Sequence, residues 1–262
     1  MPSPQSIAEQ FYHAFYEKEW PGEPAPDFRK LTVADSYEVQ GLVAELRIQS
    51  GERVVGYKVG CTSPAIQTQF GFGEPICARL FAPHVQSEGS QLNWRSYLNC
   101  AIEPEMVIRI GRDIPSGELS DQELIESIEF VSPGIELHNF KFWQQPPSIQ
   151  ELICSGGILA GLIIGDSRVD PRSLSFSDER FSVYKNDELI AEEPASEIMG
   201  GPLRSLKWLA GFLSARGDCL LKDSWVIPGS PTELIPVAKD TDLKVSIERV
   251  GDVYARFQDT PT

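Results

Sequence analysis

The sequence lacks the cysteine patterns that indicate disulfide cross-linking or a zinc site. Its five cysteines are an odd number, lie far apart and include no pair separated by two residues. Scattered single cysteines are typical of reduced thiols in a cytosolic protein. We therefore expect a cytoplasmic location, and free thiols at Cys61, Cys77, Cys100, Cys154 and Cys219.

Clusters of positive charge and long apolar runs are also lacking. The 262 residues include 23 Lys and Arg against 38 Asp and Glu, which gives a formal net charge of −15. This balance argues against binding to nucleic acid or to an anionic membrane surface. No stretch approaches the ~18 apolar residues of a membrane span, and the acidic, amphipathic N-terminus does not resemble a signal peptide. An anionic substrate would need a metal ion or a local lysine.

The N-terminal part combines helical and strand-like patterns. Apolar residues at helical spacing predict helices over 4–19, 33–50 and 63–71. A proline-rich break at 21–26 follows the first helix, and an alternating segment at 52–60 predicts a strand. Thr32 and Ser63 are the predicted N-caps of the second and third helices, where their hydroxyls would satisfy free backbone N–H groups.

From about residue 95 the pattern is mostly that of β-strands. Turn residues at 186–187 and 251–252 predict two hairpins. The predicted strands are 100–110, 130–138, 158–165, 181–185, 188–192, 224–227, 243–249 and 252–257. The predicted helices between them are 120–128 and 203–217.

The change of pattern along the chain indicates two parts. A chain of this length forms one or two domains. We predict an α+β fold, with a small N-terminal α/β portion over residues 1–85 and a larger β-rich domain over residues 86–262.

Two carboxylates stand one residue apart inside the strand predicted over 100–110. Residues i and i+2 of a strand share a face, so Glu103 and Glu105 lie about 7 Å apart on one side. A third carboxylate, Glu136, is embedded in another apolar strand. Neighbouring carboxylates repel, and a hard cation such as Mg²⁺, Mn²⁺ or Ca²⁺ removes that conflict. The alternative is that these glutamates lie on a solvated face of the sheet.

Lys58 is a second polar residue inside an apolar strand. It lies between Gly56 and Gly60, and glycines let a ligand or another backbone approach closely. A lysine in such a place could neutralise a substrate carboxylate or, if desolvated, transfer a proton. The alternative is a lysine on an exposed strand edge.

These segments together resemble a known family. The stretches GYKVGCTSPAIQTQFGFGEPICARLF (56–81), IEPEMVIRIGRDI (102–114) and VSPGIELHN (131–139) are similar to the fumarylacetoacetate hydrolase superfamily. The similarity is to its branch of 2-hydroxypenta-2,4-dienoate hydratases and 4-oxalocrotonate decarboxylases. Segments 195–217 and 225–247 fit the same branch, so the resemblance runs from about residue 30 to the end.

The resemblance implies a fold and a metal site. The fold would be a mixed β-roll that carries the active site, with the smaller α/β portion before it. The metal ligands would be Glu103, Glu105 and Glu136, binding Mg²⁺ or Mn²⁺. Members of the family are generally homo-oligomers, so a homo-oligomer is expected here.

The resemblance also implies a catalytic lysine, a substrate-binding pair and a reaction. Lys58 would be the lysine, and Gly229 and Ser230 would bind a small keto or enol acid. The implied function is a metal-dependent lyase, a hydratase or decarboxylase acting on a 2-keto or 2-hydroxy-enol acid. A keto–enol tautomerase, a C–C hydrolase, or a catalytically weak binding or assembly protein are the alternatives.

Some positions depart from the pattern of the branch. Hydratases usually carry an acidic residue where this chain has Ile76, and isoleucine cannot carry a proton. An acid and an amide are also missing from the loop at residues 154–156. His138 lies two residues after Glu136 and shares its strand face, so it is a candidate catalytic residue that could supply the missing proton transfer. The alternative is a hydrogen-bonded histidine of the strand.

Overall fold

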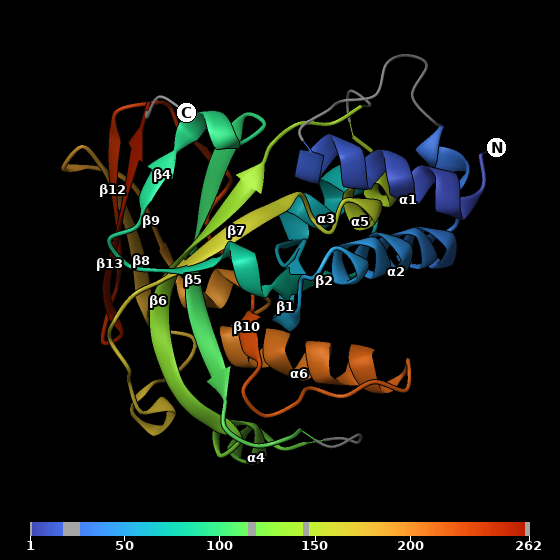
Figure 1. The fold of residues 1–262 in the computed structure, drawn as a ribbon. Helices are drawn as coiled ribbons and strands as arrows, with labels where there is room; N and C mark the ends of the chain where they lie inside the picture. The colour runs from blue at the N-terminus through green and yellow to red at the C-terminus, as the bar shows by residue number, and fades with distance from the viewer. Residues whose placement is uncertain (1, 18–26, 115–118, 144–146, 260–262) are drawn as a thin grey trace.

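Two stacked β-sheets with helices gathered at one end form the protein (Figure 1). The computed structural model describes residues 2–17, 27–114, 119–143 and 147–259. The predicted α+β class is confirmed, because long antiparallel strands and separate helices occur together. The proline-rich break predicted at 21–26 lies outside the described residues.

The larger sheet has eight strands in the order β2-β1-β10-β5-β6-β7-β3, with β11 paired to β5. It takes strands from both sides of the boundary predicted at residue 85. Its strands are β1 (Val54–Gly60), β2 (Ile76–Phe81), β3 (Val85–Ser87), β5 (Cys100–Ile110), β6 (Ile128–Asn139), β7 (Leu159–Ile164), β10 (Trp225–Ile227) and β11 (Ile235–Pro236).

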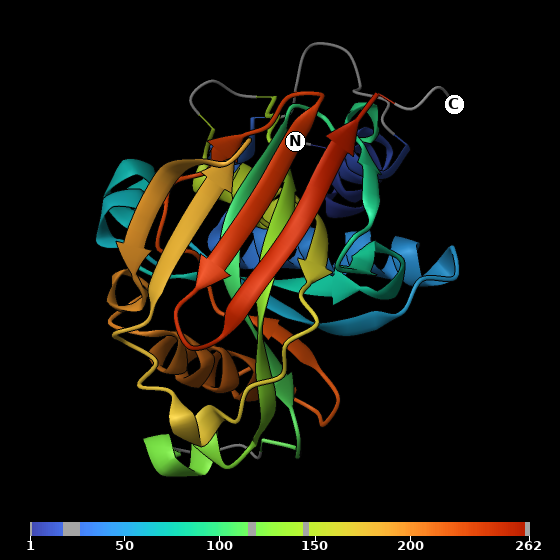
Figure 2. The ribbon, with the colours of Figure 1, turned by 90° about the vertical axis from the view of Figure 1, so that its left-hand side faces the viewer.

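The smaller sheet has five strands in the order β4-β13-β12-β8-β9, and it faces the viewer in Figure 2. Its strands are β4 (Gln91–Asn93), β8 (Arg180–Lys185), β9 (Glu188–Pro194), β12 (Thr241–Ile247) and β13 (Gly251–Gln258). Strands β12 and β13 pack against β6 of the larger sheet. The main hydrophobic core lies between the two sheets.

Strand β5 is buried on both faces, which explains its nearly continuous apolar sequence. Ile102, Met106 and Ile108 point into the core between the sheets. Val107 points to the opposite face, where it packs with Leu162 of β7 and other apolar side chains. The glutamates of β5 share the face of Val107, and they therefore lie away from the main core.

The helices are α1 (Pro4–Tyr12), α2 (Val33–Gln49), α3 (Pro64–Phe70), α4 (Asp121–Ile125), α5 (Ile149–Cys154) and α6 (Pro202–Ser214). Helices α1, α2 and α5 pack together around a second core that includes Phe11, Val39 and Ile153. Thr32 caps α2 in a capping box, and Ser63 caps α3, both as predicted. Among the described residues, no helix is both long enough and apolar enough to cross a membrane.

Several predicted elements differ in extent or position. Helix α1 stops at Tyr12 and continues as a π-helical turn over His13–Glu17, and α4 is shorter than the predicted 120–128. The turn predicted at 251–252 is wrong: the β12–β13 hairpin turns over 248–250, and Gly251 already pairs in β13. Strands β2, β3, β4 and β11 and helix α5 are additional elements that were not predicted. All five cysteines are free thiols, as expected.

Candidate active site

Four polar side chains meet on one face of the β5–β6 pair. The antiparallel register sets Glu103 of β5 directly opposite Glu136 of β6. Glu105 and His138 follow at i+2 on their own strands, so all four residues point to the same side. His138 stands opposite Ala101, whose short side chain leaves room for the imidazole ring.

Lys58 reaches this cluster from β1. Its Nζ lies 2.5 Å from Oε1 of Glu136 and donates a second hydrogen bond to the backbone carbonyl of Gly157 at 3.1 Å. The lysine is 3% exposed and Glu136 is 1% exposed, so the ion pair is buried. The sequence-based alternative of a lysine on an exposed edge is therefore wrong.

Gly157 leaves the space that the Lys58 ammonium occupies. A Cβ atom on Gly157 would lie 2.9 Å from Nζ and 3.0 Å from Cε of the lysine. The residue also has a φ of +67°, a conformation that glycine adopts without strain. The space needed by Lys58 and the left-handed backbone both explain why glycine occupies position 157.

Several buried polar atoms of the cluster lack hydrogen-bond partners among the described residues. They are Oε1 of Glu105, Oε2 of Glu136 and both ring nitrogens of His138. Buried polar atoms normally have partners. Ligand atoms of Glu103, Glu136 and His138 all lie within 4.8 Å of one another, and this donor set fits a divalent cation.

The raised pKa of Glu105 reflects the repulsion between neighbouring carboxylates. Burial raises its pKa, and repulsion from Glu136 and Glu103 raises it further. The Lys58 ammonium and the backbone N–H of Gly229 act in the opposite direction but do not compensate, so the pKa of Glu105 lies well above its ordinary value. A cation beside these carboxylates would relieve the repulsion.

Glu103 and Lys58 keep their charges because neighbouring groups outweigh the effect of burial. Burial opposes the ionisation of Glu103, but the adjacent His138 ring and Lys58 outweigh burial and lower the pKa of this carboxyl. Burial likewise opposes the charged form of Lys58. The attraction of Glu136, Glu103 and Glu105 is stronger and raises the lysine pKa, so Lys58 is an ammonium ion at neutral pH.

Gly229 lies beside the same carboxylates, and Ser230 is the next residue of the chain. The backbone N–H of Gly229 donates to Oε2 of Glu105 at 3.2 Å. Gly229 has a φ of +115°, and a Cβ atom there would lie 2.6 Å from Cγ2 of Thr62. The hydroxyl of Ser230, a largely buried residue, accepts a hydrogen bond from the backbone N–H of Thr232. The predicted substrate-binding pair therefore neighbours the predicted metal ligands.

Ile76 provides an apolar wall next to Lys58. It is fully buried and pairs with Gly60 across β1 and β2. A Cβ atom on Gly60 would lie 3.2 Å from Cγ1 of Ile76 and 3.7 Å from Cε of Lys58, so both side chains border the same glycine. A carboxyl group at position 76 would therefore come close to the lysine, and isoleucine offers no proton there.

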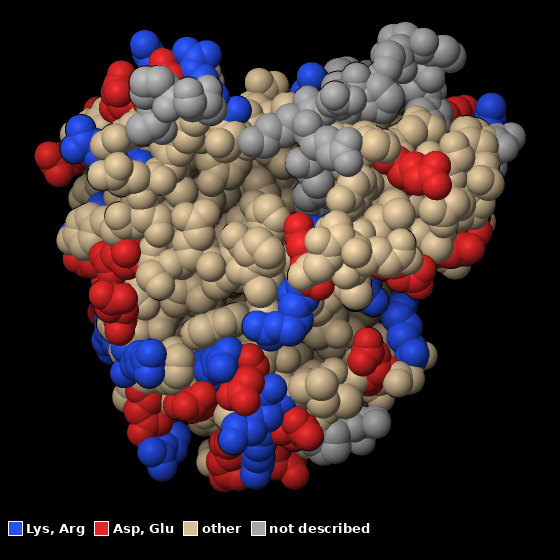
Figure 3. All heavy atoms as spheres, in the orientation of Figure 1, with Lys and Arg blue, Asp and Glu red and all other residues tan. Residues whose placement is uncertain are grey.

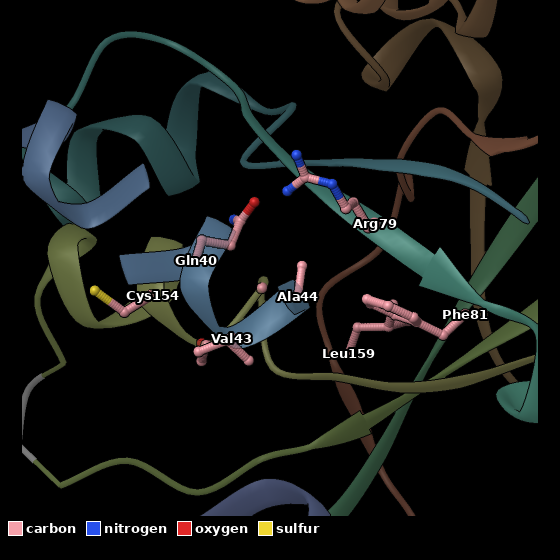
Figure 4. A pocket seen from close by; sticks show the side chains of 9 residues that line it. Gln40, Val43, Ala44, Arg79, Phe81, Cys154 and Leu159 are labelled. Atoms are coloured by element: carbon pink, nitrogen blue, oxygen red, sulfur yellow. The ribbon is translucent and has the colours of Figure 1, made fainter. Parts of the chain in front are cut away.

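A small cavity lies behind this region, between α2, β2 and the segment that joins α5 to β7 (Figure 4). Its volume of about 20 Å³ has room for roughly one water molecule. Gln40 on its wall donates hydrogen bonds to the backbone carbonyls of Cys77 and Ile153. The lining residues Ser155 and Gly156 precede Gly157 in the chain. Gln40 thus ties α2 to β2 and α5 next to the loop that holds Lys58. The cavity itself is too small for an organic substrate.

The face of the molecule in Figure 3 shows charged side chains of both signs. On this face, basic side chains lie interspersed with acidic ones.

The structure brings together all seven residues singled out in the sequence: Lys58, Glu103, Glu105, Glu136, His138, Gly229 and Ser230. Sequence reasoning missed Gly157, which makes space for the lysine. The glycine pair that follows α5 was the available signal, because consecutive glycines mark left-handed backbone or close approach.

The relatives found by comparison with known proteins include two hydratases. No family model matches the chain. A 2-keto-4-pentenoate hydratase from Paraburkholderia xenovorans is 24% identical over 255 residues, which cover 97% of this chain and 94% of the relative. The TodF product hydratase of Pseudomonas putida is 27% identical over 225 residues, which cover 85% of this chain and 83% of the relative.

Two solved structures share the fold. The 4-oxalocrotonate decarboxylase from Pseudomonas putida G7, complexed with magnesium and adipate, aligns with a TM-score of 0.89 at 24% identity, over 97% of each chain. The fumarylpyruvate hydrolase from Pseudomonas aeruginosa, in complex with Mn²⁺ and pyruvate, aligns with a TM-score of 0.62 at 17% identity. That alignment covers 78% of this chain and 89% of the other.

Proposed function

We propose, from the confirmed similarity to the hydratase and decarboxylase branch of the fumarylacetoacetate hydrolase superfamily, that this chain is a metal-dependent lyase. Its substrate would be a 2-keto or 2-hydroxy-enol acid, and its reaction hydration or decarboxylation. The observation that carries the proposal is the opposed pair Glu103 and Glu136 on β5 and β6, with Lys58 ion-paired to the second.

The carboxylates Glu103, Glu105 and Glu136 are the proposed ligands of Mg²⁺ or Mn²⁺. Oxygen ligands suit both ions, and Oε1 of Glu105 and Oε2 of Glu136 are buried without a hydrogen-bond partner among the described residues. A bound ion would supply Lewis-acid stabilisation of the negative charge that develops on the C2 oxygen of the substrate. Glu103 is 22% exposed, whereas the other two are buried, so the substrate would approach from the side of Glu103.

The remaining residues of the site have separate proposed roles. Lys58, held as an ammonium by Glu136 and Gly157, is placed to deliver a proton to the carbon skeleton of an enolate. Gly229 and Ser230 would line the substrate site, because their loop is tied to Glu105 through the Gly229 N–H. His138 was predicted as a second proton carrier, and its role is taken up below.

Ile76 favours decarboxylation or ketonisation over hydration. Hydration needs a group that activates water, and the wall beside Lys58 is apolar at this position. Decarboxylation breaks the bond to the departing CO₂ and leaves an enolate; that enolate, like the enolate of a tautomerase, then needs only a proton. Loss of CO₂ or ketonisation is therefore the expected outcome if no water adds.

A panel of 2-hydroxydienoates and 2-keto acids, followed in the ultraviolet with and without EDTA, tests the proposal. We expect the dienol absorbance to decay with Mg²⁺ or Mn²⁺ present and to persist in EDTA. Product analysis then separates hydrated acid, released CO₂ and ketonised isomer. Decay that is unchanged by EDTA would contradict a metal-dependent lyase, and decay without either hydration or CO₂ release would identify a tautomerase. A cytoplasmic location and a homo-oligomer remain predictions.

A further inference from the structure

We propose that His138 is itself a ligand of the metal, so that the site combines carboxylate oxygens with one imidazole nitrogen. This mixed donor set would favour borderline transition-metal ions such as Co²⁺, Fe²⁺ and Ni²⁺ over Mg²⁺ and Ca²⁺. The inference rests on the proposed function, because it concerns the same metal site.

The position of the ring is the first support. Nε2 of His138 lies 3.0 Å from Oε2 of Glu103 and 3.6 Å from Oε2 of Glu136. Ligand atoms at about 2.1 Å from one ion in an octahedral shell lie about 3.0 Å from their neighbours. The distance from Nε2 to Glu103 matches that spacing, and the ligand atoms of Glu103, Glu136 and His138 all lie within 4.8 Å of one another.

The absence of any other partner is the second support. His138 is 2% exposed, and its Nε2 lies close to the carboxylates of Glu103 and Glu136. Nδ1 has no hydrogen-bond partner among the described residues. In the alternative of a hydrogen-bonded strand histidine, Nε2 would donate to the carboxylate of Glu103, the same group with which it would share an ion. Coordination through Nε2, with the ring proton on Nδ1, would satisfy the nitrogen that points at the carboxylates.

Local backbone structure aims the ring into the cluster. The pairing of β6 with β7 shifts register between Leu137 and His138, and such irregularities commonly redirect a side chain next to an active site. On the other side, β6 pairs His138 with Ala101, which leaves the space over the opposing strand open.

The chemical consequence is a change of metal preference. Carboxylate and water ligands suit Mg²⁺, Ca²⁺ and Mn²⁺, whereas imidazole strengthens binding of the later first-row ions. A neutral nitrogen also adds a ligand without adding another negative charge to three carboxylates that already repel each other. The site would therefore bind Co²⁺ or Ni²⁺ more tightly than Mg²⁺.

Pulsed EPR of the Mn²⁺-loaded full chain tests the ligand directly. The chain has three histidines, and His84, which lies 3.4 Å from Glu52, provides the control. We expect ¹⁴N modulation from a coordinated imidazole in the wild type and in His84→Gln, and its loss in His138→Gln. Labelling the wild type with ¹⁵N-histidine replaces the ¹⁴N signal and needs no variant, so the test stands even if His138→Gln does not fold.

Calorimetric titrations with Co²⁺ and Mg²⁺ test the preference. We expect His138→Gln to lose about tenfold or more in Co²⁺ affinity and less than about threefold in Mg²⁺ affinity. Mn²⁺ bound without histidine ¹⁴N modulation, or equal losses for both ions, would overturn the inference and leave the proposed function standing. If no divalent ion binds the wild type at all, the proposed function fails together with it.

Discussion

Two adjacent glycines offer a sharp test of how Lys58 is positioned. Gly156 and Gly157 both have a φ of +67°, so alanine suffers the same backbone strain at either position. Their surroundings differ. A Cβ atom on Gly156 would meet Cβ of Ala78 at 3.7 Å, an ordinary contact, whereas one on Gly157 would lie 2.9 Å from Nζ of Lys58. Gly156→Ala is therefore the matched control for Gly157→Ala.

The expected magnitudes follow from these contacts. A left-handed alanine costs about 1–2 kcal/mol, and both variants should lose this much free energy of unfolding. Gly157→Ala must also push the ammonium away from the carbonyl of Gly157 and from Glu136, with which Lys58 forms its buried ion pair. A displacement of about 1 Å of a catalytic group can lower turnover about 100-fold.

Urea unfolding and metal-dependent turnover of both variants measure these effects. We expect similar stabilities within about 1–2 kcal/mol, since the end of a lysine side chain can shift, but a loss of turnover confined to Gly157→Ala. Wild-type turnover in both variants would refute the idea that Gly157 positions a catalytic lysine. Equal loss in both would assign the effect to backbone strain alone.

Two further predictions concern the charges of the cluster. Lys58→Met, measured by urea unfolding in EDTA, should lower the free energy of unfolding by about 3–5 kcal/mol, because Glu136 is left buried without the lysine ammonium. A loss below about 1 kcal/mol, as for an exposed lysine, would contradict the buried pair. In EDTA the folded state keeps the Glu105 proton at pH values where the unfolded state has lost it, since the folded pKa is raised above 4.5. The free energy of unfolding should therefore fall as pH rises above about 4.5, until the folded pKa is passed. Glu105→Gln should remove this decline, and an unchanged slope in thermal unfolding across that range would show that the pKa is not raised.

Local patterns predicted much of the fold, because they act within a few residues. The caps at Thr32 and Ser63 and the strand over 100–110 depend on short-range chemistry, and they occur as expected. The hairpin after β12 was misplaced because Gly251-Asp252 is a strong turn signal. The chain instead turns earlier and places Arg249 at a φ of +63°. Strand β2 was missed because it is short and nearly all buried, so it shows no alternation.

The site was predictable in part for the same reason. The i, i+2 spacing put Glu103 and Glu105 on one face, but the pairing of Glu103 with Glu136 depends on the register of two separate strands. The contact of Lys58 with Glu136 spans 78 positions of the chain and crosses the two strands, β10 and β5, that lie between β1 and β6. Without the resemblance to a known family, no local pattern could have joined these residues. The solvated-face alternative fails for Glu105 and Glu136, which are buried.

Mn²⁺ binding to matched variants of β6 tests the central claim most directly. Glu136→Gln removes a proposed ligand, and Glu129→Gln makes the same change on the same strand at a side chain that is 51% exposed. We predict that the wild type and Glu129→Gln bind Mn²⁺ alike in a titration followed by EPR, and that Glu136→Gln binds at least about tenfold more weakly. Equal binding by all three proteins, or no binding by the wild type, would contradict a metal site at these glutamates.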